Sequence, residues 1–315
     1  MIDKMEHLAF VFPGQGSQYV GMGKTLYEAF DEVRQLFSLA DEIANRSLTR
    51  LCFEGSMEEL TLTLNAQPCI YLVSCAVYTV LLRNGLKPSY VAGHSLGEWS
   101  AAMCAGFYDF ETGLRLVLRR AELMNSAPKG AMAALIGGSH EQVMALCERV
   151  KDKGIIVIAN YNSPSQIVIS GEVNAVEEAA RLARDFGIQR AVMLRVSGGF
   201  HSPLMQPVAA HLEEALESAQ MQDANIPLVA NVTARPVTQA SELRRLLAMQ
   251  LVSPVRWVES IQWLWDSGVK WFVEVGPRKV LSQLILQTLP NANVIQVEDP
   301  EGVDEALAKI STTAI

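Results

Sequence analysis

The chain has 315 residues, 50% of them hydrophobic, which is enough apolar material for one large globular domain or about two. Its formal net charge of -8, with acidic residues spread along the chain, argues against a general nucleic-acid-binding surface. The five cysteines show no C-x-x-C spacing and indicate core thiols of a reducing compartment. The first seven residues lack the apolar segment of a signal peptide, and we expect no apolar run to be long enough to span a bilayer. We therefore expect a cytoplasmic protein.

The first predicted element is a buried strand at residues 8–12 that leads into a glycine-rich loop at 13–18 (PGQGSQ). The loop lacks a G-K-[ST] ending, so nucleotide binding is the weaker interpretation. It does offer backbone N–H groups near Gln15, at the strand edge where active sites of open α/β sheets gather. Residues 22–85 read as helices, with expected breaks at Gly55 and 65–68.

A G-x-S-x-G sequence at 93–97 (GHSLG) lies between a predicted strand at 89–92 and a predicted helix over 101–105. Strand, glycine-flanked turn and helix form a nucleophile elbow, which exposes a serine hydroxyl at the helix N-terminus. This arrangement favours Ser95 as a nucleophile. The alternative is a chance match in a turn that contains glycine.

The predicted helix at 111–125 places the neighbouring residues Arg119 and Arg120 on different faces. On a helical wheel Arg120 falls inside the apolar arc, whereas Arg115, Arg119 and Glu122 lie on the polar side. A buried arginine is costly unless an anion meets it. The wheel alone favours an Arg120 that pairs with a carboxylate of the same chain or reaches the surface. The functional alternative is that Arg120 binds a substrate carboxylate.

Residues 127–199 show a different order of predicted strands and helices. Strands are predicted at 131–136, 155–159, 166–170 and 191–196, with helices at 139–150 and 172–186. This β-α-β-β-α-β order is the ferredoxin-like signature. We therefore predict an inserted ferredoxin-like small subdomain at 127–199 and a large subdomain formed by 1–126 and 200–315. Further strands of the large subdomain are expected at 226–231, 271–275 and 294–297.

The middle turn of the insert is assigned to residues 160–164 (NYNSP). Its two asparagines, Asn160 and Asn162, either face a ligand or cap the turn. Sequence alone favours capping, because asparagine is a common turn residue.

His201 is the best candidate for a general base, because it lies in a loop between a predicted strand and a helix that begins near residue 204. The other histidines are poorer: His7 is near the terminus, His140 starts a surface helix, His94 points away from Ser95, and His211 is in mid-helix. No acidic residue can be singled out as a third triad member. A backbone carbonyl can orient the imidazole instead.

Together these segments resemble the successive motifs of malonyl-CoA:acyl carrier protein transacylases, in order, from about residue 8 to about residue 285. The segments are 12–18 (FPGQGSQ), 93–98 (GHSLGE), Arg120, 160–164, 200–202 (FHS), Gln250 with 253–255 (SPV), and 274–277 (EVGP). The resemblance implies an α/β fold with a parallel sheet in an α/β-hydrolase-like core, and ping-pong acyl transfer.

The resemblance also implies catalytic roles. Ser95 would carry the acyl group, His201 would be the base, and the backbone carbonyl of Gln250 would orient the imidazole. Backbone N–H groups of Gln15 and Leu96 would form the oxyanion hole.

For the substrate, the resemblance implies that Arg120 holds a malonyl carboxylate. Phe200 would crowd an α-substituent, since related enzymes that accept methylmalonate usually carry serine there. Asn160 and Asn162 complete the candidate substrate-binding residues. No metal or bound cofactor is expected; malonyl-CoA is the substrate and phosphopantetheine belongs to the carrier partner.

The expected partner is an acidic acyl carrier protein, with no nucleic acid and no membrane, and the enzyme is expected to be a monomer. Basic residues could provide a docking patch or simply be solvated surface charge. They are Arg181, Arg184, Arg190, Arg278 and Lys279.

Two questions stay open in the sequence. Gly198-Gly199 resembles the loop of free-standing acyltransferases that serve polyketide synthases in trans, so both fatty acid and polyketide supply are retained. A thioester hydrolase would use the same Ser95 and His201, but such proofreading enzymes tend to lack the arginine. A non-enzymatic scaffold is disfavoured, because Ser95, His201 and Arg120 are all present.

Overall fold

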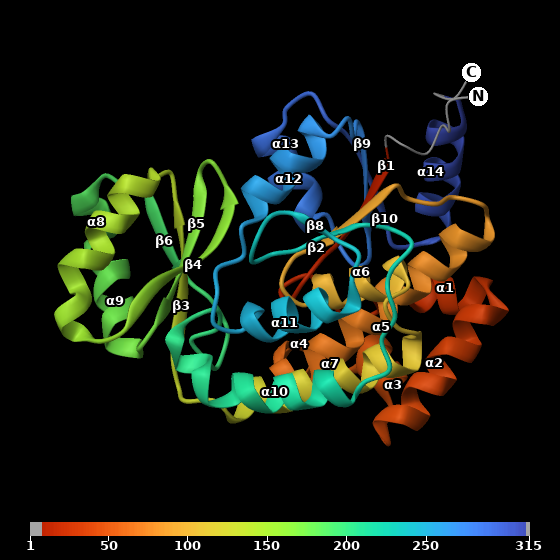
Figure 1. The fold of residues 1–315 in the computed structure, drawn as a ribbon, viewed down its shortest axis with the longest axis horizontal. Coiled ribbons are helices and arrows are strands. Elements are labelled where there is room, and N and C mark those ends of the chain that lie inside the picture. The colour runs from red at the N-terminus through yellow and green to blue at the C-terminus, as the bar shows by residue number, and fades with distance from the viewer. Residues whose placement is uncertain (1–7, 313–315) are drawn as a thin grey trace.

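A computed structural model describes residues 8–312, so the predictions for His7 and for the start of the chain lie outside the described residues. The larger part is built on a six-stranded sheet in the order β10-β9-β1-β2-β7-β8 (Figure 1). All pairs are parallel except β7 with β8. The strands are β1 (Leu8–Phe12), β2 (Tyr90–Gly93), β7 (Leu228–Val229), β8 (Pro236–Val237), β9 (Trp271–Val275) and β10 (Asn293–Val297).

Both faces of this sheet are covered, which explains why β1 reads as an unbroken apolar run. Phe10 and Phe12 point into the core that contains α5 (Thr63–Arg83) and α7 (Phe110–Ser126). Ala9 and Val11 point to the opposite core, beneath α12 (Trp257–Asp266) and α13 (Val280–Thr288). The remaining helices of this part are α1 (Lys24–Ala29), α2 (Asp31–Ala44), α3 (Leu48–Glu54), α4 (Met57–Thr61), α6 (Gly97–Ala105), α10 (Gln206–Ser218), α11 (Ala240–Gln250) and α14 (Pro300–Thr312).

The helix break expected at 65–68 is wrong, because α5 runs unbroken from Thr63 to Arg83 with Pro68 inside it. A proline in a helix leaves the carbonyl four residues earlier without its N–H partner. Here that carbonyl belongs to Leu64, and it accepts a hydrogen bond from Arg46 Nη2 at 2.5 Å. A tertiary contact thus replaces the missing helical bond.

The expectation that no apolar run is long enough to span a bilayer is wrong. By length and composition alone α5 is long and apolar enough to cross a bilayer. However, 83% of its most apolar window is buried inside the protein, which is the pattern of a core helix. All five cysteines are free; four are buried and Cys147 is partly buried, in line with core thiols.

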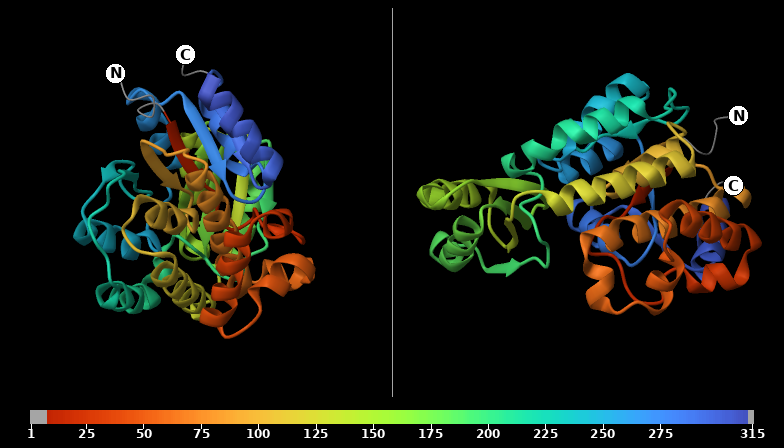
Figure 2. Two further views of the ribbon diagram at one scale, coloured as in Figure 1. Left: turned by 90° about the vertical axis from the view of Figure 1, so that its right-hand side faces the viewer. Right: turned by 90° about the horizontal axis from the view of Figure 1, so that it is seen from below.

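The smaller part is a four-stranded antiparallel sheet in the order β4-β5-β3-β6. It contains β3 (Ala131–Ile136), β4 (Ile156–Ser163), β5 (Gln166–Gly171), β6 (Arg190–Met193), α8 (His140–Val150) and α9 (Val173–Leu182), with 3-10 turns η1 (Lys151–Lys153) and η2 (Ala183–Phe186). It projects from the larger part, and α8 and α9 cover its outer face (Figures 1 and 2). A third 3-10 turn, η3 (Pro203–Met205), leads into α10.

The turn assigned to 160–164 is wrong, because β4 continues through Asn160 and Asn162 to Ser163, and only residues 164–165 form the turn. The end of β4 is held on two sides. It pairs with β5, and Val255 exchanges backbone hydrogen bonds with Ala159 and Tyr161 at 2.8 and 2.9 Å. The asparagines are therefore strand residues and do not cap a turn.

Side chains alternate across the small sheet with period two. In β3, Ala133 and Leu135 pack under α8 and α9, whereas Met132 and Ala134 belong to the core shared with the larger part. This second face of the small sheet is the one that faces the candidate site.

Candidate active site

Ser95 sits on the sharp turn between β2 and α6, with a φ of 52° that a non-glycine residue rarely adopts. The turn is pressed against the end of β1. A Cβ on Gly97 would lie 1.9 Å from the carbonyl oxygen of Phe12, and one on Gly14 would lie 2.4 Å from that of His94. Only glycine allows these approaches, which bring the loop after β1 onto the elbow.

Asn231, which sequence reasoning missed, clamps the elbow from both sides. Its Oδ1 accepts a hydrogen bond from the Ser95 N–H at 2.8 Å, and its Nδ2 donates to the carbonyl of Gly93 at 2.6 Å. The clamp spans the strained residue and holds it in place. No local sequence signal could have found it, because Asn231 lies 136 positions after Ser95.

His201 and Ser95 are in hydrogen-bond contact, with 2.8 Å between Nε2 and Oγ. On the other side of the ring, Nδ1 lies 2.8 Å from the backbone carbonyl of Gln250. A carbonyl only accepts, so Nδ1 carries the proton and Nε2 is left as the acceptor for the serine hydroxyl. Burial, and then the nearby charge of Arg120, lowers the pKa of His201 to about 3. The imidazole is therefore neutral near pH 7 and can act as a base.

This environment predicts an unusual pH profile. Because the pKa of His201 is lowered from 6.5 to about 3, the basic form persists as the pH falls through the ordinary histidine range. We expect kcat/KM for acylation of Ser95 by an acyl donor that carries no carboxylate, a quantity that reports the free enzyme, to stay flat from about pH 8 to about pH 5. Stopped-flow measurement across this range, with circular dichroism at each pH as the control for unfolding, checks it. A decline centred near 6.5 in folded protein would contradict it.

Arg120 lies on the buried face of α7, as the wheel predicts, with 1% of its surface exposed. Its Nη1 donates to Gln67 Oε1 at 2.7 Å, and its Nη2 lies 3.1 Å from Ser95 Oγ and 3.0 Å from Gln250 Oε1. Within residues 8–312 it forms no salt bridge, and its Nε has no partner. The structure thus contradicts both a direct salt bridge of Arg120 with a carboxylate of the same chain and a position at the surface.

The charge on Arg120 is consequently uncompensated by direct contact. Burial lowers the pKa of the guanidinium to about 9, which leaves it charged near neutral pH. Arg115 and Arg119 instead lie on the exposed face and pair with Glu111 and Glu122, as the wheel predicts. A buried cation beside the serine, held by neutral groups, forms a site for an anion.

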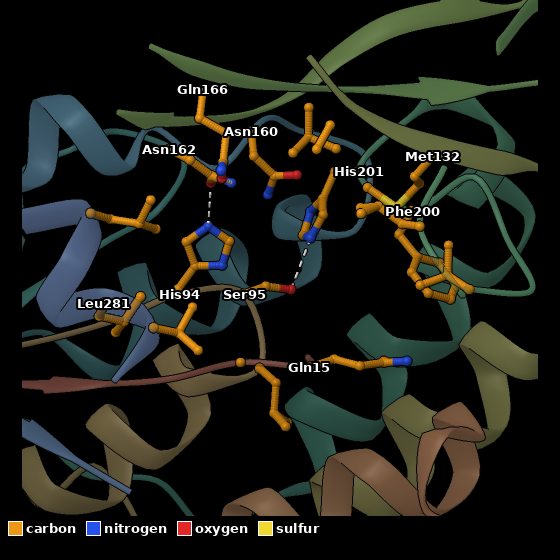
Figure 3. Close-up of a pocket in the computed structure, with 18 of the residues that line it drawn as sticks. Gln15, His94, Ser95, Met132, Asn160, Asn162, Gln166, Phe200, His201 and Leu281 are labelled. Carbon is orange, nitrogen blue, oxygen red and sulfur yellow. Dashed lines mark hydrogen bonds between the residues drawn. The ribbon is translucent and has the colours of Figure 1, made fainter. Parts of the chain in front are cut away.

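Ser95, His201 and Arg120 line a cavity of about 330 Å³, which is within the size range of small-molecule sites. The elbow forms its floor, and the open face of the small sheet forms its roof (Figure 3). The roof contributes Met132 and the two strand asparagines, while Phe200 closes one side. Phe200 is 5% exposed.

The prediction that His94 points away from Ser95 is wrong, because His94 lines the same cavity. Its Nε2 lies 2.7 Å from Asn162 Oδ1, which links the elbow to the small sheet. The other two described histidines, His140 and His211, lie on α8 and α10 and do not line the cavity.

The two groups suggested for an oxyanion hole also border the cavity. Gln15 lies in the loop after β1, and Leu96 is the residue before the first turn of α6. Neither backbone N–H is bonded to an acceptor in the described part of the chain. The N–H of Leu96 stands at the N-terminal end of α6, where the positive end of the helix dipole favours negative charge.

Eight of the nine candidate site residues from the sequence therefore line one cavity. Gln250, the ninth, is fully buried behind His201 and contacts it through its carbonyl. Sequence reasoning missed Gln67 and Asn231, which hold Arg120 and the elbow, and assigned no role to Glu98.

Residues 9–303 match the acyl transferase domain family. The chain belongs to this family. It is 45% identical to the malonyl CoA-acyl carrier protein transacylase of Bacillus subtilis, over 96% of this chain and 97% of that one. It is 42% identical to the polyketide biosynthesis malonyl CoA-acyl carrier protein transacylase PksC of the same species, over 88% and 96%. The resemblance found in the motifs is thereby confirmed.

Solved structures agree. A malonyl-transacylase whose structure was solved in complex with its type II polyketide synthase acyl carrier protein superposes with a TM-score of 0.93, at 37% identity over 96% of this chain and 99% of that one. The mixed α/β fold with a parallel sheet is thus the fold of known malonyltransferases.

Proposed function

We propose that the protein transfers a malonyl group from malonyl-CoA to the phosphopantetheine thiol of an acyl carrier protein, through an acyl-enzyme on Ser95. One observation carries the proposal: Ser95 Oγ lies 2.8 Å from His201 Nε2 and 3.1 Å from Arg120 Nη2. A nucleophile with a neutral base on one side and a buried cation on the other suits an acyl group that ends in a carboxylate. The names of the relatives support the same activity.

In the first half-reaction His201 Nε2 accepts the hydroxyl proton as Ser95 Oγ attacks the thioester carbonyl carbon. The negative charge that develops on the carbonyl oxygen is stabilised by the N–H groups of Gln15 and Leu96. Collapse of this intermediate breaks the C–S bond, and His201 gives the proton to the departing CoA sulfur. The malonyl group remains as an ester on Ser95.

The second half-reaction runs the same steps with a different thiol. His201 accepts the proton of the phosphopantetheine thiol, whose sulfur attacks the malonyl ester. Collapse breaks the bond to Ser95 Oγ, and the proton returns from His201 to the serine. The carbonyl of Gln250 keeps the imidazole in the required tautomer throughout.

Arg120 and Phe200 set the choice of acyl group in this proposal. The guanidinium binds the free carboxylate of malonate, a group that acetate lacks. The Phe200 ring borders the cavity next to His201 and limits room for an α-substituent. Asn160 and Asn162, on the strand that roofs the cavity, complete the binding surface.

We further propose a large α/β-hydrolase-like subdomain of residues 1–126 and 200–315 and a ferredoxin-like subdomain of residues 127–199. The strand order β4-β5-β3-β6, with α8 and α9 on one face, supports the second assignment. The elbow after β2 supports the first.

For the carrier protein, we propose docking near Arg278 and Lys279. Both are exposed, and they immediately precede α13, whose residues line the cavity. Arg181 is less suitable, because Glu178 already pairs with it. We expect the enzyme to act as a cytoplasmic monomer that supplies fatty acid or polyketide synthesis; relatives of both kinds support this breadth.

One assay tests the function against the thioester hydrolase alternative, which would use the same Ser95 and His201. The protein is incubated with malonyl-CoA or acetyl-CoA and with several holo carrier proteins, and acyl-carrier product and free acid are both quantified. We expect malonyl transfer to exceed hydrolysis and acetyl transfer by at least about 100-fold. Release of free acid as the main product would contradict transfer and support the hydrolase.

A further inference from the structure

Glu98 is a buried carboxylate to which the mechanism gives no task. It lies in the first turn of α6, three residues after Ser95, and is 1% exposed. Its Oε1 accepts a hydrogen bond from the N–H of Asn231 at 2.8 Å, and its Oε2 accepts a hydrogen bond from Gln250 Nε2. Burial raises the pKa of this carboxyl to about 7, so its burial is costly and calls for a compensating role.

The side-chain amide of Gln250 links Glu98 to Arg120. Its Nε2 donates to the Glu98 carboxylate and to the Ser95 carbonyl, the latter at 2.9 Å. Its Oε1 accepts from Arg120 Nη2 at 3.0 Å and from Trp99 Nε1 at 3.4 Å. The same residue orients His201 through its backbone carbonyl.

An ionised carboxylate can only accept hydrogen bonds, so it determines which end of the amide faces which way. With Nε2 turned to Glu98, Oε1 must face Arg120. The flipped amide would place N–H against the guanidinium N–H and an oxygen against the carboxylate, which is unfavourable on both sides.

The link also balances charge. In the described part of the chain Arg120 has no carboxylate in direct contact, and Glu98 provides a negative charge one amide away. A direct ion pair would occupy the guanidinium. The relay through Gln250 leaves Arg120 Nη2 beside Ser95, with its Nε unpartnered.

We propose that Glu98 is a positioning residue that acts through the amide of Gln250 to aim and charge-balance Arg120 for the carboxylate of the acyl group. This inference rests on the proposed function, in which Arg120 binds that carboxylate. Glu98 touches neither substrate nor reacting atoms, and its effect is on the choice of acyl group.

The test is Glu98→Gln, which keeps the size of the side chain but can also donate a hydrogen bond, so the orientation of Gln250 is no longer determined. We expect kcat/KM for acyl-enzyme formation with malonyl-CoA to fall by about 10- to 100-fold. With acetyl-CoA, which does not use Arg120, we expect a fall of less than about 3-fold. Quenched-flow labelling with both donors gives the selectivity ratio, and thermal unfolding checks the fold.

Ser100→Ala is the matched control, since Ser100 lies on the same helix, is fully buried, and has no hydrogen-bond partner in residues 8–312. It should retain the wild-type ratio. Gln250→Met keeps the backbone carbonyl but removes the amide that joins Glu98 to Arg120, so it should also lower the ratio of malonyl to acetyl kcat/KM. The double variant Glu98→Gln/Gln250→Met should have a malonyl-to-acetyl ratio no lower than that of the more impaired single variant, because each substitution breaks the same connection between Glu98 and Arg120.

An equal fall with both donors would overturn the proposal, because it would mean that Glu98 acts only by holding the elbow through Asn231. An unchanged ratio in both Glu98→Gln and Gln250→Met would overturn it as well. Wild-type protein that forms no malonyl adduct, or takes acetyl-CoA equally well, would instead refute the proposed function.

Discussion

Ser95→Ala is expected to abolish the malonyl adduct and to lower carrier malonylation by about 10⁴- to 10⁶-fold. The substitution removes the only atom in the cavity that is both hydrogen-bonded to His201 Nε2 and next to Arg120, among the residues that the structure describes. Intact-protein mass spectrometry after incubation with malonyl-CoA measures the adduct, and a radiolabelled transfer assay measures the rate.

Ser100→Ala again provides the control, because it removes a buried hydroxyl from α6 without touching the cavity. It should form the adduct at the wild-type rate. An adduct that persists in Ser95→Ala would place the acyl group on another residue and would refute the nucleophile assignment.

Arg120→Ala is expected to lower kcat/KM for malonyl-CoA by about 140- to 4,000-fold, since removing one member of a buried charge pair typically costs about 3–5 kcal/mol. Acetyl-CoA gains nothing from the guanidinium, so its kcat/KM should be unchanged or higher. The ratio of the two, measured by competition between labelled donors, reports the carboxylate clamp directly.

Arg119→Ala is the neighbouring control, because Arg119 lies on the exposed face of α7 and pairs with Glu122. Arg119→Ala should change kcat/KM for neither malonyl-CoA nor acetyl-CoA. Arg120→Met, which fills more of the space left by the guanidinium, separates loss of charge from loss of packing. Intact malonyl transfer in a folded Arg120→Ala protein, without a gain in acetyl transfer, would disprove the clamp.

Much of the fold could be predicted because its signals are local. The strand at 8–12, the strand at 131–136 and the amphipathic helix at 111–125 all occur within about two residues of the predicted bounds. Two other strands are shorter than predicted: the one expected at 191–196 ends at Met193, and the one expected at 226–231 is only Leu228–Val229. The errors at 65–68 and 160–164 have tertiary causes. Arg46 takes over the carbonyl that Pro68 leaves unpaired, and β5 with Val255 extends β4 beyond the expected turn.

The sequence by itself determined which groups could do chemistry: a serine on a glycine-flanked elbow, a histidine in a loop, and an arginine on the apolar side of a helix. These follow from contiguous residues, because turn geometry and helical periodicity are properties of a short stretch of chain.

Only the tertiary structure decided how these groups meet. The contacts of Ser95 with Arg120, His201 and Asn231 join residues 25, 106 and 136 positions apart, and no local pattern encodes such distances. The large sheet and the helices packed on it bring them together. It turns His201 Nε2 toward the serine, denies Arg120 a direct counter-ion, and connects that arginine to Glu98 through Gln250. A buried polar group must find its partner wherever the fold supplies one, so its partner can be read only from the assembled structure.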